Sequence, residues 1–207
     1  MNPNEQQTPQ QVWNALKEGN ERFVEDRAER PNADPSRRHS LVEGQDPRVV
    51  VISCSDSRVP VELIFDMGLG DAFVIRTAGH IVDNTVLASL EYAIDNLGCN
   101  LVVVMGHQSC GAINAASTFV NGEVQVPSGF QRTIIEMVSL STLAARSRGE
   151  SSAEEFERAH TVETVRQLLA RMPSLSQKIV EGTMGVVGTR YRLEDSSVES
   201  VVKHGVS

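Results

Sequence analysis

Short apolar runs, separated by longer segments with helical periodicity, constrain the fold of this chain more than any other feature. The first run, residues 48–53, is rich in β-branched side chains and is typical of a strand buried on both faces. Strands that alternate with helices require crossover connections, and these produce a largely parallel sheet. We therefore predict an α/β fold with a central, mostly parallel β-sheet flanked by helices. The predicted strands are 48–53, 72–76, 101–105 and 184–187, and the predicted helices are 59–65, 85–97, 111–119, 134–146, 153–172 and 175–180.

The N-terminal part of the chain predicts a helical arm. Thr8 is followed by Pro9, a pair that is typical of a helix start, and apolar residues then recur at helical spacing as far as Val24. Residues 30–43 carry prolines and scattered charges without any period, so we predict an extended surface linker there. The expected organisation is a single domain over residues 1–207, with the arm and linker over 1–46 and the core over 47–193.

Composition and charge exclude several classes of protein. The 27 acidic residues outnumber the 19 basic ones and give a net charge of −8, which opposes binding to nucleic-acid phosphates. No run approaches the roughly 18 apolar residues of a membrane span, and the polar opening segment does not resemble a secretory leader. Three cysteines are an odd number and do not suggest a disulfide framework. We expect a cytoplasmic protein without nucleic-acid or membrane partners.

Polar cysteine motifs follow two of the predicted strands. Cys54 opens the segment Cys-Ser-Asp-Ser-Arg after the first strand, and His107 and Cys110 follow the third. Ligands bind at the carboxyl ends of strands in open α/β sheets, so both motifs lie where a site is expected. Two thiolates and one imidazole suit zinc, and three protein ligands leave the fourth position open, as in catalytic zinc sites.

Other interpretations of the same residues stay open on the sequence alone. A cysteine often packs as a small apolar residue, and Cys99, at the end of a predicted helix, fits that description. Cys54 and Cys110 differ from it because polar side chains surround them. A nucleophilic cysteine with His107 as its base is also compatible with the pattern, although it leaves Cys110 without a role.

The motif pair resembles that of the β-class carbonic anhydrases, in particular their plant-type branch. The resemblance implies their fold, a homodimer or a dimer of dimers, and reversible hydration of carbon dioxide to bicarbonate and a proton by zinc-bound hydroxide. One departure is His80, where the family commonly carries asparagine. We expect this histidine to alter the local hydrogen bonding and to leave the metal ligands intact. The likeness covers residues 47–193. Besides the two motifs, the residues in this range that carry it are Phe65, Asp66, Gly68, Gly70, Asp71, Ala72, Phe73, Arg76, Ala78, Gly79, Glu91, Tyr92, Ala93, Val187 and Gly188.

The same resemblance implies roles for individual residues. It makes Cys54, His107 and Cys110 the ligands of one zinc ion per chain, with Asp56 and Arg58 as a polar pair beside the metal. It makes Gln45 a residue that orients substrate. The residues implied for the apolar substrate pocket, partly supplied by the neighbouring subunit, are Phe73, Ala78, Tyr92 and Gly111.

Asp56 has a second expected role, because a carboxylate two residues from a ligand can itself bind zinc. In such a closed state it occupies the open position and stops catalysis, whereas Arg58 can hold it away through a bidentate pair. Hydroxide becomes scarce as the pH falls, while a carboxylate with an ordinary pKa near ~4 stays ionised. The sequence therefore predicts a reversible pH switch, with activity that rises into the alkaline range.

Two other functions use the same residues. One is hydrolysis of carbonyl sulfide or carbon disulfide, which would share the scaffold and the metal and differ in the shape of the pocket. The other is a zinc-stabilised protein without turnover. Asp56, Arg58 and Gln45 argue against this last alternative, because a structural zinc ion does not require them.

Overall fold

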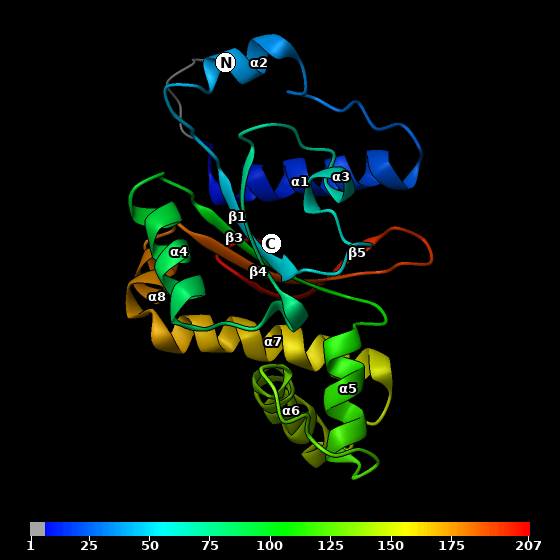
Figure 1. The fold of residues 1–207 in the computed structure, drawn as a ribbon. Helices are drawn as coiled ribbons and strands as arrows, with labels where there is room; N and C mark the ends of the chain where they lie inside the picture. The colour runs from blue at the N-terminus through cyan, green and yellow to red at the C-terminus, as the bar shows by residue number, and fades with distance from the viewer. Residues whose placement is uncertain (1–6) are drawn as a thin grey trace.

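The computed structural model describes residues 7–207 and has a five-stranded sheet at its centre (Figure 1). Residues 1–6, on which the expectation of no secretory leader partly depends, lie outside the described part. The strands are β1 (Val49–Cys54), β2 (Ala72–Thr77), β3 (Leu101–His107), β4 (Gly185–Tyr191) and β5 (Val198–His204). Their order is β2-β1-β3-β4-β5, and every neighbouring pair is parallel except β4 and β5. This confirms the predicted mostly parallel sheet.

Helices cover both faces of this sheet, as Figure 1 shows. Their bounds are α1 (Pro9–Val24), α2 (Pro35–Ser40), α3 (Val61–Ile64), α4 (Asn84–Asp95), α5 (Gly111–Val120), α6 (Gln131–Ser147), α7 (Ala153–Arg171) and α8 (Pro173–Val180). Successive side chains of a strand point to opposite faces. Val49 and Val51 thus pack with α1 and α3, whereas Val50 and Ile52 pack with α4, α7 and α8. None of the helices between residues 7 and 207 is long and apolar enough to cross a bilayer.

Helix α1 begins where the sequence predicts and packs against its own chain. The Thr8 hydroxyl accepts a hydrogen bond from the backbone N–H of Gln11, whose side chain caps the Thr8 backbone in return. Trp13 is only 2% exposed and lies in one apolar cluster with residues of β1, β3 and α3. Burial of this indole stabilises the docking of the arm onto the sheet.

Two features differ from the predictions. The prediction of an extended linker over residues 30–43 is wrong in the middle of that segment, because helix α2 forms there. The Asp34 side chain caps α2 by accepting a hydrogen bond from the Arg37 N–H, and Pro35 occupies the first turn of the helix. Strand β5 was not predicted, and it adds an antiparallel edge to the sheet. Its register shifts opposite Gly188 and Thr189, so its apolar residues do not alternate as in a regular half-buried strand.

Candidate metal centre

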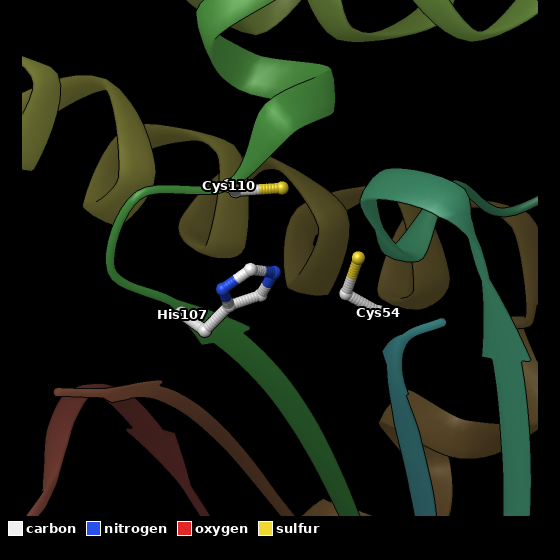
Figure 2. Close-up of side chains that lie close together, drawn as sticks. All are labelled: Cys54, His107 and Cys110. Atoms are coloured by element: carbon white, nitrogen blue, oxygen red, sulfur yellow. The ribbon is translucent and has the colours of Figure 1, made fainter. Parts of the chain in front are cut away.

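Three side chains that are distant in the sequence converge at the carboxyl ends of β1 and β3 (Figure 2). Cys54 ends β1, His107 ends β3, and Cys110 is the residue immediately before α5. Their ligand atoms lie within 4.8 Å of one another, and all three residues are buried. The convergence follows from the sheet itself, because β1 and β3 are parallel neighbours with Ser53 paired to Met105.

The imidazole of His107 is oriented as a metal ligand. Its Nδ1 lies 2.9 Å from the backbone carbonyl oxygen of Gln108. A carbonyl can only accept, so Nδ1 carries the proton and Nε2 presents its lone pair. This Nε2 is buried and has no hydrogen-bond partner within residues 7–207. An unpaired buried nitrogen is costly, and a metal ion at this point removes that cost.

The two thiols influence each other strongly. A hydrogen bond from Cys110, together with the backbone N–H groups of Asp56 and Gly79, lowers the pKa of Cys54 to about 4. The pKa of Cys110 is raised in turn, because it donates to Cys54 and is buried. A divalent cation between the sulfur atoms allows both to be thiolates. Two thiolates and a neutral imidazole are a donor set that fits zinc and does not suit magnesium or calcium.

Asp56 and Arg58 form a bidentate pair beside this cluster. Arg58 Nε lies 3.0 Å from Oδ1 of Asp56 and Nη2 lies 2.8 Å from Oδ2, and the Arg58 backbone N–H also donates to Oδ1. These hydrogen bonds hold the pKa of the Asp56 carboxyl well below its usual range. Its Oδ2 is 4.0 Å from Nε2 of His107. An ionised carboxylate therefore lies next to the position that a metal ion would occupy, restrained by Arg58.

Arg76 supports the same segment from β2. Its Nε donates to the carbonyl oxygen of Cys54 at 3.1 Å, and its Nη2 donates to that of Asp56 at 2.7 Å. The sequence places Arg76 within the family likeness but gives it no role. Its two backbone contacts assign it to holding the turn that follows β1.

Helix α7 contacts the loop between His107 and Cys110 and the loop that follows β2, although the sequence alone does not single this helix out. Glu157 Oε1 accepts a hydrogen bond from the Ser109 N–H at 2.6 Å, and His160 Nε2 lies 2.9 Å from the carbonyl oxygen of Gly79. Glu157 and His160 are both buried. Because this helix has many charged residues, no pattern in its sequence distinguishes these two buried side chains from the charged side chains on its solvated face.

Neither ring nitrogen of His80 has a hydrogen-bond partner within the described residues. The side chain is fully buried, and desolvation lowers its pKa well below the ordinary value. The ring packs against that of His160, with the centroids 4.5 Å apart. His80 thus acts as a neutral packing group behind the metal centre.

The other residues implied by the resemblance divide into two groups within one chain. Ala78 and Gly111 are exposed and lie near the ligands: Gly111 follows Cys110, and Ala78 precedes Gly79, whose N–H donates to the sulfur of Cys54. Phe73 belongs to the other group. It pairs with Val50 near the start of the strands, four residues before the end of β2, and at the usual rise per residue it lies roughly 13 Å from that end of the strand.

The second group lies away from the ligands of the same chain. Tyr92 accompanies Phe73, with their ring centroids 6.3 Å apart, and is 48% exposed. Gln45 is exposed in the segment between α2 and β1. The metal ligands, Asp56 and Arg58 are thus brought together, whereas Gln45, Phe73 and Tyr92 are not brought to them by this chain.

The chain is similar in sequence and in fold to known carbonic anhydrases. Residues 49–198 match the family described as carbonic anhydrase. The chain is 48% identical over 187 residues to carbonic anhydrase 2 of Mycobacterium tuberculosis, and the match covers 90% of each chain. It is 49% identical over 191 residues to the carbonic anhydrase of Mycolicibacterium smegmatis, with 92% of each chain covered. The solved β-carbonic anhydrase CcaA superposes with a TM-score of 0.70 and 27% identity over 91% of this chain and 86% of that one.

Proposed function

This chain belongs to the β-carbonic anhydrase family, and from that membership we propose that it catalyses the reversible hydration of carbon dioxide to bicarbonate and a proton with one zinc ion per chain. The observation that carries the proposal is the convergence of Cys54, His107 and Cys110 beside the restrained Asp56–Arg58 pair. A structural zinc site needs only the ligands, whereas a charged pair at its edge serves a reaction.

The ligand set determines what the metal contributes. When bound there, zinc supplies a nucleophile near neutral pH by lowering the pKa of a coordinated water, from roughly 15.7 to about 7 in a three-histidine site. Cys54 and Cys110 place more negative charge around the ion than imidazoles do. We therefore expect the corresponding pKa in this protein to lie above that of the three-histidine site.

Asp56 and Arg58 orient the reacting groups. The Asp56 carboxylate, fixed by two hydrogen bonds from Arg58, would accept a hydrogen bond from the nucleophile and so direct its lone pair toward the substrate carbon. Arg58 also opposes the movement of this carboxylate into the open coordination position. Its Nη2 is anchored in turn by the carbonyl oxygen of Ser109 at 3.2 Å.

The substrate pocket is proposed to be completed by a second copy of the chain. Ala78 and Gly111 would line it from the chain that holds the metal, and Gln45, Phe73 and Tyr92 from the partner. The separation of these two groups within one chain supports this division. A homodimer, or a dimer of such dimers, is then the smallest active unit.

Stopped-flow measurement of carbon dioxide hydration on zinc-loaded protein tests the proposed reaction. We expect turnover that depends on zinc content. Zinc-loaded protein without hydration activity would refute it, and hydrolysis of carbonyl sulfide or carbon disulfide by the same preparation would identify the alternative substrates.

Mixing two inactive variants tests whether Gln45 acts across the dimer. Gln45→Ala keeps the metal but should lose activity by about 100-fold, as on removal of a donor that stabilises developing charge. Cys110→Ala lacks the metal but supplies Gln45. Randomly mixed dimers should regain about a quarter of wild-type activity, because half are mixed and each of these has one complete site.

Two results would contradict the role of Gln45. No gain on mixing would show that Gln45 does not act on the partner's metal centre. Wild-type activity in the Gln45→Ala protein alone would show that Gln45 has no part in the reaction.

Hydration activity should be low at neutral and acidic pH and should rise reversibly in alkaline solution. Arg58 holds the pKa of Asp56 well below its usual range, so this carboxylate stays ionised while hydroxide falls about tenfold per pH unit. At a bound zinc ion, Asp56 would therefore leave Arg58 and take the open position as the pH falls, and hydroxide would displace it as the pH rises. Rates from about pH 6 to about pH 9, together with X-ray absorption of the zinc at both ends of that range, measure this competition. A flat profile with no carboxylate bound at low pH would exclude the switch.

A further inference from the structure

We propose that one face of α7 positions two loops of the metal centre, with Glu157 and His160 as positioning residues. One loop joins His107 to Cys110, and the other follows β2 and contacts the ligand Cys54. The inference rests on the proposed function and extends it to a helix that supplies no ligand. Glu157 and His160 are three residues apart and therefore lie on the same side of the helix. Each contacts the backbone of a different loop, one on either side of the cluster formed by Cys54, His107 and Cys110.

The first contact fixes the loop between His107 and Cys110. Ser109 has a φ of 57°, a left-handed conformation that a serine rarely adopts without support. Its N–H donates to Glu157 Oε1 at 2.6 Å, and its carbonyl oxygen accepts from Arg58 Nη2 at 3.2 Å. Glu157 therefore supports both the ligand Cys110, which follows Ser109, and the anchor of the Arg58 side chain.

Glu157 is itself held in place by a buried ion pair. Its Oε2 accepts from Arg190 Nε at 2.7 Å, and both side chains are almost completely buried, at 2% and 4% exposure. Arg190 lies on β4, next to β3. The two oxygens of the Glu157 carboxylate thus accept from two different donors, Ser109 N–H and Arg190 Nε, and these hydrogen bonds fix the orientation of the side chain.

The second contact fixes the loop that follows β2. The Gly79 carbonyl can only accept, so His160 Nε2 carries the proton, and Nδ1 lies 2.8 Å from the Ser141 hydroxyl oxygen. The Gly79 N–H donates to the sulfur of Cys54 at 3.3 Å. Gly79 has a φ of 67°, and a Cβ there would lie 2.7 Å from that of Ala112. His160 thus positions a glycine whose own N–H contacts a ligand.

The two contacts are alike. Ser109 and Gly79 both have a left-handed backbone, and in each residue both the N–H and the carbonyl group make a hydrogen bond. The helix approaches the end of β3 closely enough for this only because residue 106 is glycine: a Cβ there would lie 2.3 Å from Thr161 Oγ1. Outer-shell partners orient metal ligands and adjust their electron donation. Loss of either contact should therefore loosen the metal and change the donation of its sulfur ligands.

Glu157→Gln is a sharp test of the first contact, because glutamine has the same shape but one acceptor oxygen. That oxygen turns toward the charged Arg190, and Ser109 loses its acceptor. Glu154→Gln is the matched control, since Glu154 also lies near Arg190, at 3.7 Å, but does not contact Ser109. We expect zinc loss to a chelator to be about 10–100-fold faster in Glu157→Gln and unchanged in Glu154→Gln.

His160→Leu and His160→Gln test the second contact. Leucine removes the donor, whereas the glutamine amide can still donate to the Gly79 carbonyl. Zinc release should be faster by about 10–100-fold in the leucine variant and close to wild type in the glutamine variant. In cobalt-substituted protein, the sulfur-to-metal absorption bands should change in the leucine variant and return in the glutamine variant.

The outcomes separate this inference from the proposed reaction. Wild-type zinc release and wild-type cobalt spectra in both Glu157→Gln and His160→Leu would overturn the role of α7, even if carbon dioxide is hydrated. Zinc-loaded wild type that does not hydrate carbon dioxide would refute the reaction and leave the release experiment valid. If His160→Leu does not fold, Ser141→Ala, which removes the hydroxyl that contacts His160 Nδ1, takes its place.

Discussion

We expect the Cys110→Ala variant to lose most of its zinc and, with it, the hydration activity. Only Cys54 and His107 would remain as ligands, whereas catalytic zinc sites use three. The loss of affinity should exceed the roughly 10–100-fold effect of changing an outer-shell partner. Elemental analysis of the purified variant and the stopped-flow assay measure the two effects. Full zinc occupancy in this variant would show that the ligand set is wrong.

Cys99→Ala is the matched control for this experiment. Cys99 is also buried, but burial raises its pKa to about 12, and its thiol donates to the carbonyl oxygen of Pro47 at 3.2 Å. It is therefore a protonated packing residue in the cluster between the sheet and α4. We expect this variant to keep its zinc and its activity.

The Arg58→Ala variant should keep its zinc and lose activity by roughly 10–100-fold in the alkaline range, where the wild type is active. Without the two bonds from Arg58, the Asp56 carboxylate is free to move the short distance onto the metal, since its Oδ2 lies 4.0 Å from His107 Nε2. X-ray absorption should then detect a carboxylate oxygen on zinc at pH values where the wild type has none.

Arg132→Ala provides the comparison for Arg58→Ala. It breaks an exposed pair with Glu136 on α6 and should leave both zinc coordination and turnover unchanged. Wild-type turnover and an unchanged pH profile in Arg58→Ala would show that the Asp56–Arg58 pair is only structural.

The sequence by itself determined the class of the fold and the identity of the candidate ligands. β-Branched runs mark the strands because such side chains fill a sheet that is buried on both faces, as in β1 and β3. The carboxyl ends of parallel strands meet at one edge of the sheet, so Cys54 and His107 could be expected to converge before any coordinates existed. Local capping chemistry also predicted the start of α1 at Pro9.

Only the tertiary structure decided which distant groups complete the centre. Ser109 and Glu157 are 48 residues apart, and Gly79 and His160 are 81 apart, so neither contact leaves a local pattern. The same holds for β5, whose irregular register hides its alternation, and for the separation of Gln45, Phe73 and Tyr92 from the ligands of their own chain. The periodicity of apolar residues in the sequence indicates which side chains are buried, because each helix or strand turns one regularly spaced set of side chains toward the core. The partner of a buried polar group depends on how elements pack, which is a property of the whole chain.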